Sequence, residues 1–486
     1  MRLIHIKASP GKYAYVIRMS AIPDLDAELL RRYDRPGPRY TSYPTSPQFS
    51  GDFGAKELRE AVHRSNEDPI PRRLSVYIHM PFCMSPCFYC GCNRIITRDL
   101  AQGEVYLARL YREIELTSTL FDRDREVVQL HFGGGTPNFL SPGQLAEAVD
   151  VLRGHFRFGK ADDADLSIEL DPRFLKPDDV RTLAAAGFNR ASLGVQDFDP
   201  LVQQAVNRIQ TVGETLAIIE ACRTHGLRSV NVDLIYELPR QSLEGFARTL
   251  DTVIATRPDR LAVYGYAHLP GMFKAQRQLL AEDLPTPDLK LRLLCLAINK
   301  LTSAGYVHIG MDHFALPDDA LAIAQRHGSL HRNFMGYTTY ADTDLIGMGV
   351  SAISHIGDSF SQNPRDLPSW QIALDEGRLP VFRGMRLSDD DLLRADLIQQ
   401  LMCQGEISTG GLERRHAIEF SVYFADELAR LRSLEEDGLV RLEPGRIVAT
   451  RQGRLMLRNI AMCFDPYLQN PMPAAPTPGV GFSRAI

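Results

Sequence analysis

Residues 83–92, CMSPCFYCGC, hold four cysteines within ten positions and directly follow the apolar run SVYIHM at 75–80. A short apolar run of this kind is typical of a β-strand that is covered on both faces. The sequence therefore predicts a dense group of thiols at the C-terminal end of a buried strand. The chain has 486 residues and eight cysteines, and the other four are scattered singly at Cys222, Cys295, Cys403 and Cys463.

Similar apolar runs recur along the chain, with helical patterns such as 105–120 and 213–225 between them. Strand followed by helix, in repeated order, predicts parallel βαβ units. We therefore expect an α/β fold built on a partial (β/α)6, TIM-like barrel, which carries its chemistry at the C-terminal ends of its strands. The further runs lie at 127–132, 166–170, 190–195, 229–235 and 260–266, with a weaker seventh at 306–311.

Polar residues and glycines gather at the ends of these predicted strands. Glu169 closes the third strand, and Asp233 lies near the end of the fifth. Because parallel strands of a barrel present their C-terminal ends on one face, we expect these residues to meet there although the chain spreads them widely. The others are Gly133, Gly134, Gly135, Thr136, Asp171, Gln196 and Asp197.

A domain boundary is indicated near residue 380, because Pro, Gly and Ser become frequent from 357 to 384. Beyond it, GLVRLEPGRIVATRQG at 438–453 predicts two strands joined at Glu443-Pro444-Gly445 and a helix after Gly453. We predict an N-terminal extension at 1–50, the barrel at 51–380, a mostly helical, winged-helix-like domain at 381–470 and a loose tail at 471–486. A true start at Met19, which leaves 1–18 as a poorly packed extension, is an alternative.

The composition is that of an ordinary globular protein, with 44% hydrophobic and 24% charged residues. A net charge of −5 argues against a nucleic-acid partner. No apolar run is long enough to cross a bilayer, and the first residues do not form a secretory signal. We expect a cytoplasmic protein, and in that reducing compartment clustered cysteines more often bind metal or react than form disulfides.

The cysteine spacing fits an iron–sulfur cluster. Cys83, Cys87 and Cys90 fall within eight residues, and a loop of this kind can give one thiolate to each of three irons of a cubane. Cys92 lies only two residues after Cys90, too near for both to reach different irons easily. Three ligands leave one iron open for a substrate or cofactor. A structural zinc site is the alternative, but it usually needs four ligands in two pairs, and the chain has no second CxxC or HxxxH pair.

CxxxCxxC after the first strand of a β/α barrel resembles the signature of radical S-adenosylmethionine enzymes. From about residue 30 onward the chain resembles the family of oxygen-independent coproporphyrinogen III oxidases. The matching segments are GPRYTSYPT (37–45), YIHMPFCMSPCFYCGCN (77–93), HFGGGTP (131–137), SIELDP (167–172), LGVQDF (193–198), NRIQ (207–210), DLIYELP (233–239), YAHLP (266–270), GMDHFALP (310–317), GYTT (336–339) and GMGVSAIS (347–354).

This resemblance implies a barrel of the radical S-adenosylmethionine type and a [4Fe-4S] cluster held by Cys83, Cys87 and Cys90. It also implies two molecules of S-adenosylmethionine and a 5′-deoxyadenosyl radical that attacks two propionates of coproporphyrinogen III, giving the vinyl groups of protoporphyrinogen IX. The residues expected to be catalytic are Cys92, Tyr77 and Glu169. The positions expected to contact S-adenosylmethionine are Tyr77, Tyr89, Gly134, Gly135, Thr136, Glu169, Gln196, Arg208, Asp233, Ala267 and Ile353. An electron donor such as flavodoxin or ferredoxin, and a monomeric state, are also expected.

The substrate of that family carries four propionates, so we expect a broad apolar pocket with cations at its rim, and Arg39 and Arg332 are the candidates. The rings and prolines of 37–45 predict that this segment folds back over the active site and excludes solvent. Three positions depart from the family pattern: Glu237 replaces a usual glycine, Gly265 a usual asparagine and Met335 a usual glutamine.

Three other functions are kept as alternatives. One is a haem-trafficking relative, although such relatives lack the 37–45 segment and usually have an aromatic residue in place of Cys92. Another is a radical enzyme that acts on haem, such as a ring-opening methyltransferase. The third is a non-enzymatic metal-binding scaffold. Products formed from coproporphyrinogen or haem distinguish the first two, and cleavage of S-adenosylmethionine excludes the third.

Overall fold

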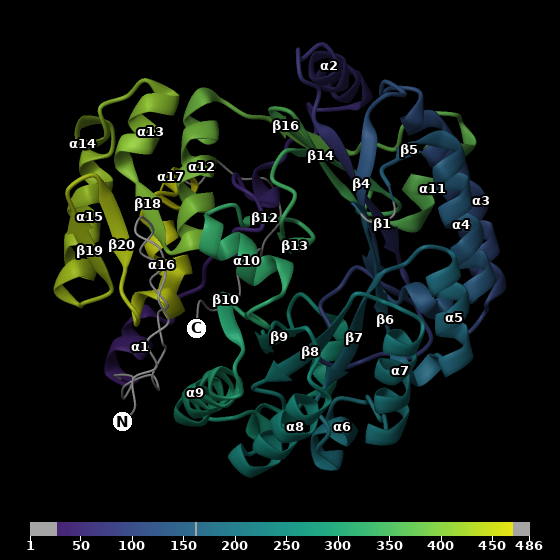
Figure 1. Ribbon diagram of the computed structural model, residues 1–486, viewed down its shortest axis with the longest axis horizontal. Coiled ribbons are helices and arrows are strands. Elements are labelled where there is room, and N and C mark those ends of the chain that lie inside the picture. Colours follow the sequence, from purple (N-terminus) through teal and green to yellow (C-terminus); the bar gives the residue numbers. More distant parts are fainter. Residues whose placement is uncertain (1–26, 161–162, 470–486) are drawn as a thin grey trace, which may run out of the picture.

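The computed structural model describes residues 27–160 and 163–469 (Figure 1). The extension at 1–18 and the tail at 471–486 that the sequence predicted lie outside the described residues. Among the described helices, none combines the length and apolar character needed to cross a membrane.

Six neighbouring parallel strands form the centre of the molecule, as the sequence predicted. They pair in chain order, so that each strand–helix unit adds to the same edge of the sheet. Their bounds are β1 (Arg73–Met80), β4 (Glu126–Gly134), β6 (Asp165–Leu170), β7 (Arg190–Gln196), β8 (Ser229–Tyr236) and β9 (Arg260–Gly265).

Helices cover the outer face of this sheet (Figure 1). Local sequence sets where they begin. At the start of α4, the Ser141 hydroxyl accepts a hydrogen bond from the Gln144 amide, and the Gln144 side chain accepts one from the Ser141 amide. These two bonds satisfy amide groups that have no partner within the helix. The helices of this layer are α3 (Ala101–Ser118), α4 (Pro142–His155), α5 (Pro177–Ala185), α6 (Pro200–Ala205), α7 (Val212–Thr224), α8 (Leu243–Thr256) and α9 (Pro287–Ser303).

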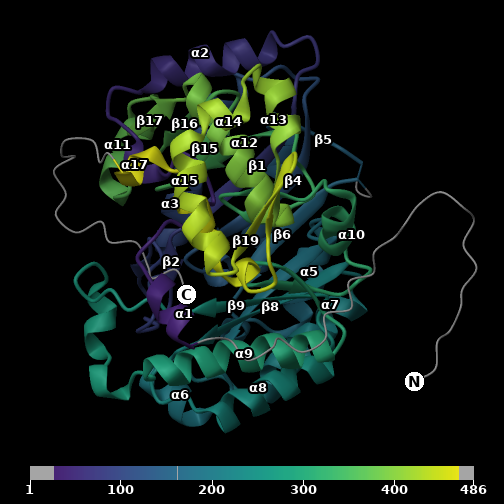
Figure 2. The same ribbon diagram turned by 90° about the vertical axis from the view of Figure 1, so that its left-hand side faces the viewer.

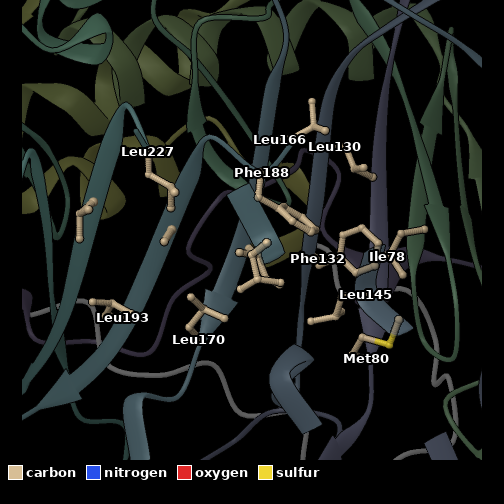
Figure 3. Close-up of a cluster of buried hydrophobic side chains, with 14 of the residues drawn as sticks. Ile78, Met80, Leu130, Phe132, Leu145, Leu166, Leu170, Phe188, Leu193 and Leu227 are labelled. Atoms are coloured by element: carbon tan, nitrogen blue, oxygen red, sulfur yellow. The ribbon is translucent and has the colours of Figure 1, made fainter. Parts of the chain in front are cut away.

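Successive residues of these strands face different surroundings. In β6, Leu166, Ile168 and Leu170 are buried, whereas Ser167 and Glu169 are only partly buried. The apolar set packs between sheet and helices, where Phe132, Leu145 and Phe188 also lie (Figure 3). The other set turns to the inside of the barrel, so each strand supplies core residues on one face and polar groups on the other.

The sheet continues beyond the six strands on both sides. On one side β14 (Thr343–Met348) pairs in parallel with β1, followed by antiparallel β15 (Ile353–Ile356), β16 (Ser359–Gln362) and β17 (Arg383–Arg386). On the other, β11 (His313–Ala315) pairs with β9, and β10 (Val307–Gly310) pairs with β11. The predicted seventh strand therefore forms, but β11 separates it from β9. No pairing joins β10 to β17 within the described ranges, so the barrel is partial, as predicted.

The C-terminal part is the predicted winged-helix-like domain. Its two hairpin strands, β19 (Val440–Glu443) and β20 (Arg446–Ala449), flank the expected turn, and β18 (Glu406–Ser408) pairs with β20. Its core is an apolar cluster separate from that of the barrel. Its helices are α12 (Asp389–Gln404), α13 (Thr409–His416), α14 (Phe420–Tyr423), α15 (Ala425–Glu436), α16 (Leu457–Met462) and α17 (Pro466–Gln469).

The described N-terminal segment packs on this C-terminal domain. Tyr33 of α1 (Ala27–Tyr33), Tyr40 and Tyr43 belong to the C-terminal apolar cluster, and the Tyr40 hydroxyl donates to Asp465 at 2.9 Å. Figure 2 shows α1 beside the C-terminal helices and strands. The remaining short elements are α2 (Ala55–Asn66), β2 (Phe82–Cys83), β3 (Ile95–Ile96), β5 (Arg157–Phe158), α10 (Ala320–His327), β12 (His331–Asn333), β13 (Gly336–Thr338) and α11 (Leu367–Asp375).

Candidate functional site

The cysteine loop leaves the C-terminal end of β1 and is closed by a short parallel pairing of β2 with β3. The Thr97 amide donates to the Cys83 carbonyl at 3.0 Å, and the Phe88 amide donates to the Val206 carbonyl at 3.0 Å. The loop is therefore fixed at its ends and in its middle, which gives its thiols defined positions before any ligand binds.

Arg94 is the residue that organises the inside of this loop. Its guanidinium donates to the carbonyl oxygens of Cys87 at 3.2 Å, Cys90 at 3.1 Å and Cys92 at 3.4 Å. One side chain thus donates to three carbonyls of a tight loop, of which, among the described residues, only that of Cys87 also accepts from a backbone amide, that of Cys90 at 3.3 Å. Nothing in the sequence spacing of Arg94 distinguishes it from a surface arginine.

The sulfur atoms lie in a setting that suits bound thiolates. Thr136 Oγ1 lies 3.3 Å from the Cys83 sulfur, and Arg208 and Arg173 donate to the Cys87 sulfur at 3.5 and 3.7 Å. Hydrogen bonds to sulfur and nearby cations stabilise thiolates and tune an iron–sulfur centre. Cys83 and Cys87 are buried and Cys90 is half-buried.

Cys92 stays apart from these three. It is exposed, and its thiol hydrogen-bonds Cys90. That contact, helped by Arg94, lowers the pKa of Cys90 to about 6, and the same contact raises the pKa of Cys92. The pair therefore favours one thiolate at Cys90 beside a neutral Cys92, whereas burial raises the pKa of Cys83 to about 11.

Asp171 anchors the arginines behind the loop. It accepts from Arg173 at 2.7 Å and from Arg208 at 3.0 Å, and its side chain is only 6% exposed. Burial on its own would raise the pKa of Asp171, but the two guanidinium groups lower it below the usual value. Asp171 therefore remains a carboxylate that fixes Arg208 against Cys87. The sequence pattern indicated Asp171 and Arg208 but gave no sign of Arg173.

A second group of predicted residues meets at the ends of β1, β4 and β6. The Tyr77 ring stacks on the His131 ring at 5.9 Å between centroids, and the Tyr77 hydroxyl lies 3.1 Å from His79 Nδ1. Glu169 lies 3.4 Å from His131 and accepts from the Gly134 amide at 3.1 Å. Burial would raise the pKa of Glu169, but these contacts lower it below the usual value.

The glycines after β4 have a packing reason of their own. Gly134 has φ +113°, and a Cβ there would lie 2.6 Å from the His79 ring. A Cβ on Gly135 would lie 2.8 Å from the Met80 carbonyl oxygen. Glycine is thus required for β4 to pass closely along β1. The contact of these glycines with a cofactor stays a prediction.

The inward faces of the strands surround a cavity with about 960 Å³ of empty space, part of it open to solvent. Asp233 accepts from Ser192 and Asn231, each at 2.8 Å, and burial, with Glu169 nearby, raises its pKa to about 6. The cavity can therefore hold a cationic or hydroxyl-bearing ligand at this carboxylate. Its further walls include His131, Glu169, Tyr264, His313, Met335 and Tyr337.

Other predicted residues lie outside the lining of this cavity. Gln196 ends β7 with φ +68°, and Ile353 lies on β15 against the backbone of Gly347. Tyr89 and Ala267 are tied together by the buried Gln276 amide, which donates to their carbonyls at 2.9 and 3.0 Å. Gln276 thus joins the cysteine loop to the segment after β9, and no residue pattern marks it in the sequence.

The two candidate rim cations differ from each other. Arg39 pairs with Asp312 at 2.8 Å and lies 5.7 Å from the centre of the Tyr264 ring, a wall of the cavity. Arg332 is buried and donates to the carbonyl oxygens of Arg39 and Tyr40. Arg332 therefore holds the N-terminal segment in place, and it also lies 5.3 Å from the centre of the Tyr337 ring, so each cation borders one aromatic wall of the cavity.

The three departures from the family pattern lie near this site. Tyr236 of β8 pairs with Gly265 of β9, and a Cβ on Gly265 would lie 3.0 Å from the Tyr236 hydroxyl. Glu237 follows Tyr236, and its carboxylate accepts a hydrogen bond from Lys290 at 2.9 Å. Met335 lines the cavity. Two departures are therefore neighbours at one end of the sheet.

The zinc alternative finds no support in the geometry. Within residues 27–160 and 163–469, no three His, Cys, Asp or Glu side chains converge on a point that a single metal ion would occupy. A zinc ion needs such convergence, whereas a cubane takes its thiolates at separate iron corners. The described residues thus offer no preformed site of three ligands for a single ion.

Comparison with protein families agrees with this site. The Radical SAM superfamily matches residues 77–253, and the HemN C-terminal domain matches residues 387–456. Membership of the first implies a [4Fe-4S] cluster and S-adenosylmethionine. The three loop thiols, with donors on Cys83 and Cys87, fit the cluster.

Relatives extend the match over nearly the whole chain. The oxygen-independent coproporphyrinogen III oxidase of Pseudomonas aeruginosa is 51% identical over 91% of this chain and 96% of that protein, and that of Escherichia coli is 48% identical over 92% and 96%. The solved structure of coproporphyrinogen III oxidase (HemN) from Escherichia coli, described as a radical SAM enzyme, superposes with a TM-score of 0.86 and 47% identity over 91% of this chain and 99% of that one. The chain therefore belongs to the family of oxygen-independent coproporphyrinogen III oxidases.

Proposed function

We propose that this protein converts coproporphyrinogen III to protoporphyrinogen IX without oxygen, as an oxidoreductase of haem biosynthesis. The observation that carries the proposal is the 51% identity over 91% of the chain to an enzyme named for this substrate. In each of two propionates one hydrogen atom is removed, and loss of CO2 and one further electron leaves a vinyl group.

Cys83, Cys87 and Cys90 would hold the cluster. When bound, the cluster and S-adenosylmethionine supply the 5′-deoxyadenosyl radical that removes the hydrogen atom. The protein would bind and orient these two groups and shield them from water. Arg94 holds the backbone of two of these residues, Cys87 and Cys90, and Asp171 aims Arg208 at Cys87.

The carboxylates of the site suit the polar groups of S-adenosylmethionine. Glu169 is held ionised and would take a cation or ribose hydroxyls, and Asp233 would take an ammonium or hydroxyl group. Gln196, Arg208 and Asp233 are proposed for a second molecule of the cofactor, where Arg208 suits its carboxylate. The other proposed contacts are Tyr77, Tyr89, Gly134, Gly135, Thr136, Ala267 and Ile353.

Cys92, Tyr77 and Glu169 are the proposed catalytic residues. Cys92 is an exposed neutral thiol beside the ligand Cys90, which fits a role as a proton or hydrogen donor near the open iron. Tyr77 and Glu169 both contact His131, so the two side chains form one polar unit between the cysteine loop and the cavity.

The cavity is proposed to receive the tetrapyrrole, with Arg39 facing one propionate. The described part of the predicted extension, residues 27–50, would close over the bound substrate, and the hydrogen bonds from Arg332 to the carbonyls of Arg39 and Tyr40 support that role. Exclusion of water protects a reactive radical from side reactions. We further propose a monomer in the cytoplasm that receives electrons from a flavodoxin or ferredoxin.

The test is a product assay on protein purified without oxygen and reconstituted with iron and sulfide. With dithionite, S-adenosylmethionine and coproporphyrinogen III, mass spectrometry is expected to detect loss of two CO2 and formation of 5′-deoxyadenosine. Cys87→Ala should abolish both, whereas Cys295→Ala, which removes a cysteine on α9 far along the chain, should not. Formation of 5′-deoxyadenosine without decarboxylation would contradict the substrate and direct attention to Met335.

A further inference from the structure

The cysteine loop lies at the protein surface and is surrounded by exposed basic residues. Cys92 and Gly91 are exposed, so the loop is not sealed inside the barrel. Arg98 follows β3 two residues after Ile96, and Arg365 lies beside the loop because its carbonyl accepts from Asn93 at 3.0 Å. Both arginines are exposed.

Two further cations reach the loop from the segment after β9. Lys274 and Arg277 lie on the short helix Lys274–Gln278, whose Gln276 donates to the Tyr89 carbonyl. The neighbouring Phe273 ring lies against Gly91, where a Cβ would be 3.0 Å from it. Both cations are exposed. Three separate segments that carry exposed basic residues thus lie at or beside the loop.

These cations have no carboxylate partners. Among the residues that the structure describes, Arg98, Lys274, Arg277 and Arg365 form no ion pair within 4.0 Å, although many other exposed arginines do. The two carboxylates beside them are used as helix caps instead. Asp99 accepts from the Ala101 amide at 3.2 Å, and Asp366 accepts from the Ser369 amide at 2.9 Å.

The charge here runs against that of the whole chain. Segments 84–100, 270–280 and 363–367 contain five basic residues and two acidic ones, whereas the full chain has a net charge of −5. Apolar side chains stand among them: Ile96 is 42%, Leu100 57% and Met272 43% exposed. A small apolar area with a basic rim is the usual form of a transient docking surface for an acidic protein.

We propose that this basic surface around the cysteine loop docks an acidic one-electron carrier protein. The inference rests on the proposed function, because that chemistry starts with one electron that must enter from outside. One electron leaves the reduced carrier, which is oxidised by one electron, and the metal site of the enzyme is reduced by one electron; no bond is made or broken. A carrier docked here would lie against the cysteine loop, in which Gly91 and Cys92 are exposed.

Binding tests the surface independently of catalysis. Oxidised flavodoxin, an acidic carrier, is titrated into the cluster-loaded full chain at low ionic strength, and its Kd is measured by calorimetry. The triple variant Arg98→Glu, Lys274→Glu and Arg365→Glu is expected to raise the Kd at least about tenfold, since rim charges of one sign steer such complexes. High salt should weaken the wild-type complex in the same direction.

The matched control reverses three exposed, unpaired cations elsewhere and so changes the net charge equally: Arg181→Glu, Arg414→Glu and Arg432→Glu. This control should keep the wild-type Kd. Both triple variants should form 5′-deoxyadenosine normally with dithionite, which needs no docking surface. Equal weakening by both triples, an unchanged Kd in the first, or no binding by the wild type would overturn the proposal. Failure of the proposed function would appear separately, as no decarboxylation with dithionite.

Discussion

Glu237 should destabilise the protein in a way that depends on pH. It follows β8 with φ +70°, a backbone conformation that side chains other than glycine adopt at a cost of roughly 1–2 kcal/mol. Glu237 is only 5% exposed, and its carboxylate accepts a hydrogen bond from Lys290 at 2.9 Å. The family pattern usually has glycine here, so this chain carries both the strained backbone and a buried carboxyl.

The magnitude follows from the shift in ionisation. Burial raises the pKa of Glu237 from 4.5 to about 7, although Lys290 opposes the shift. A carboxyl whose pKa is raised by folding binds its proton more tightly in the folded state. The contribution of this carboxyl to the free energy of unfolding is therefore fully present below pH 4.5 and is lost as the pH rises toward 7. At 1.36 kcal/mol per unit, the loss at high pH is on the order of 3 kcal/mol.

The assay is thermal unfolding of wild type, Glu237→Gln and Glu237→Gly at about pH 5 and about pH 8, where the carboxyl is mainly neutral and mainly charged. Glu237→Gln removes the titration and keeps the backbone strain, so it should raise the Tm by a few degrees at the higher pH and hardly at all at the lower. Glu237→Gly also relieves the backbone strain, so its Tm should exceed that of Glu237→Gln by the same amount at both pH values. If Glu237→Gln unfolds like the wild type at both values, the buried-carboxyl reasoning is refuted.

Three further predictions concern the cysteine loop and its support. Arg94→Met should lower the iron bound per reconstituted chain, because three loop carbonyls lose their donor, whereas Arg98→Met should not. Asp171→Asn should destabilise the protein by about 3–5 kcal/mol in urea unfolding, since it leaves buried guanidinium charge without its partner; an unchanged midpoint would contradict this. Gly134→Ala should destabilise by at least ~1 kcal/mol because its Cβ meets His79, while Gly213→Ala, in open space on α7, should be neutral or stabilising.

The arrangement of strands could be predicted because it follows from periodicity. Each apolar run of suitable length became one of the six parallel strands, and their shared direction brought Tyr77, Glu169 and Asp233 to one end of the barrel. The turn at Glu443-Pro444-Gly445 was visible for a similar reason, since proline and glycine restrict the backbone locally. These features depend on residues close together in the sequence.

The supporting contacts could not be predicted because they join distant segments through backbone atoms. Arg94 and Gln276 act on carbonyl oxygens, which every residue has, so no residue pattern marks them. The strands β15 to β17 were missed because each has only four residues, and β14, which has six, was missed because it leads into a stretch rich in glycine and serine. The insertion of β11 between β9 and β10 depends on a pairing of three residues, which periodicity does not resolve.

The alternation along each strand explains how one sheet provides both stability and chemistry. In β6, Ile168 is fully buried against the helices while its neighbour Glu169 faces the interior beside His131. A change at Ile168 therefore acts through packing, and a change at Glu169 acts through charge at the site. Because neighbouring residues point to opposite faces, a shift of one position in strand register would exchange the two roles. The close passage of β4 along β1 at Gly134 and Gly135 adds a further constraint on that register, so the glycines contribute to the site by fixing where Glu169 and Tyr77 meet.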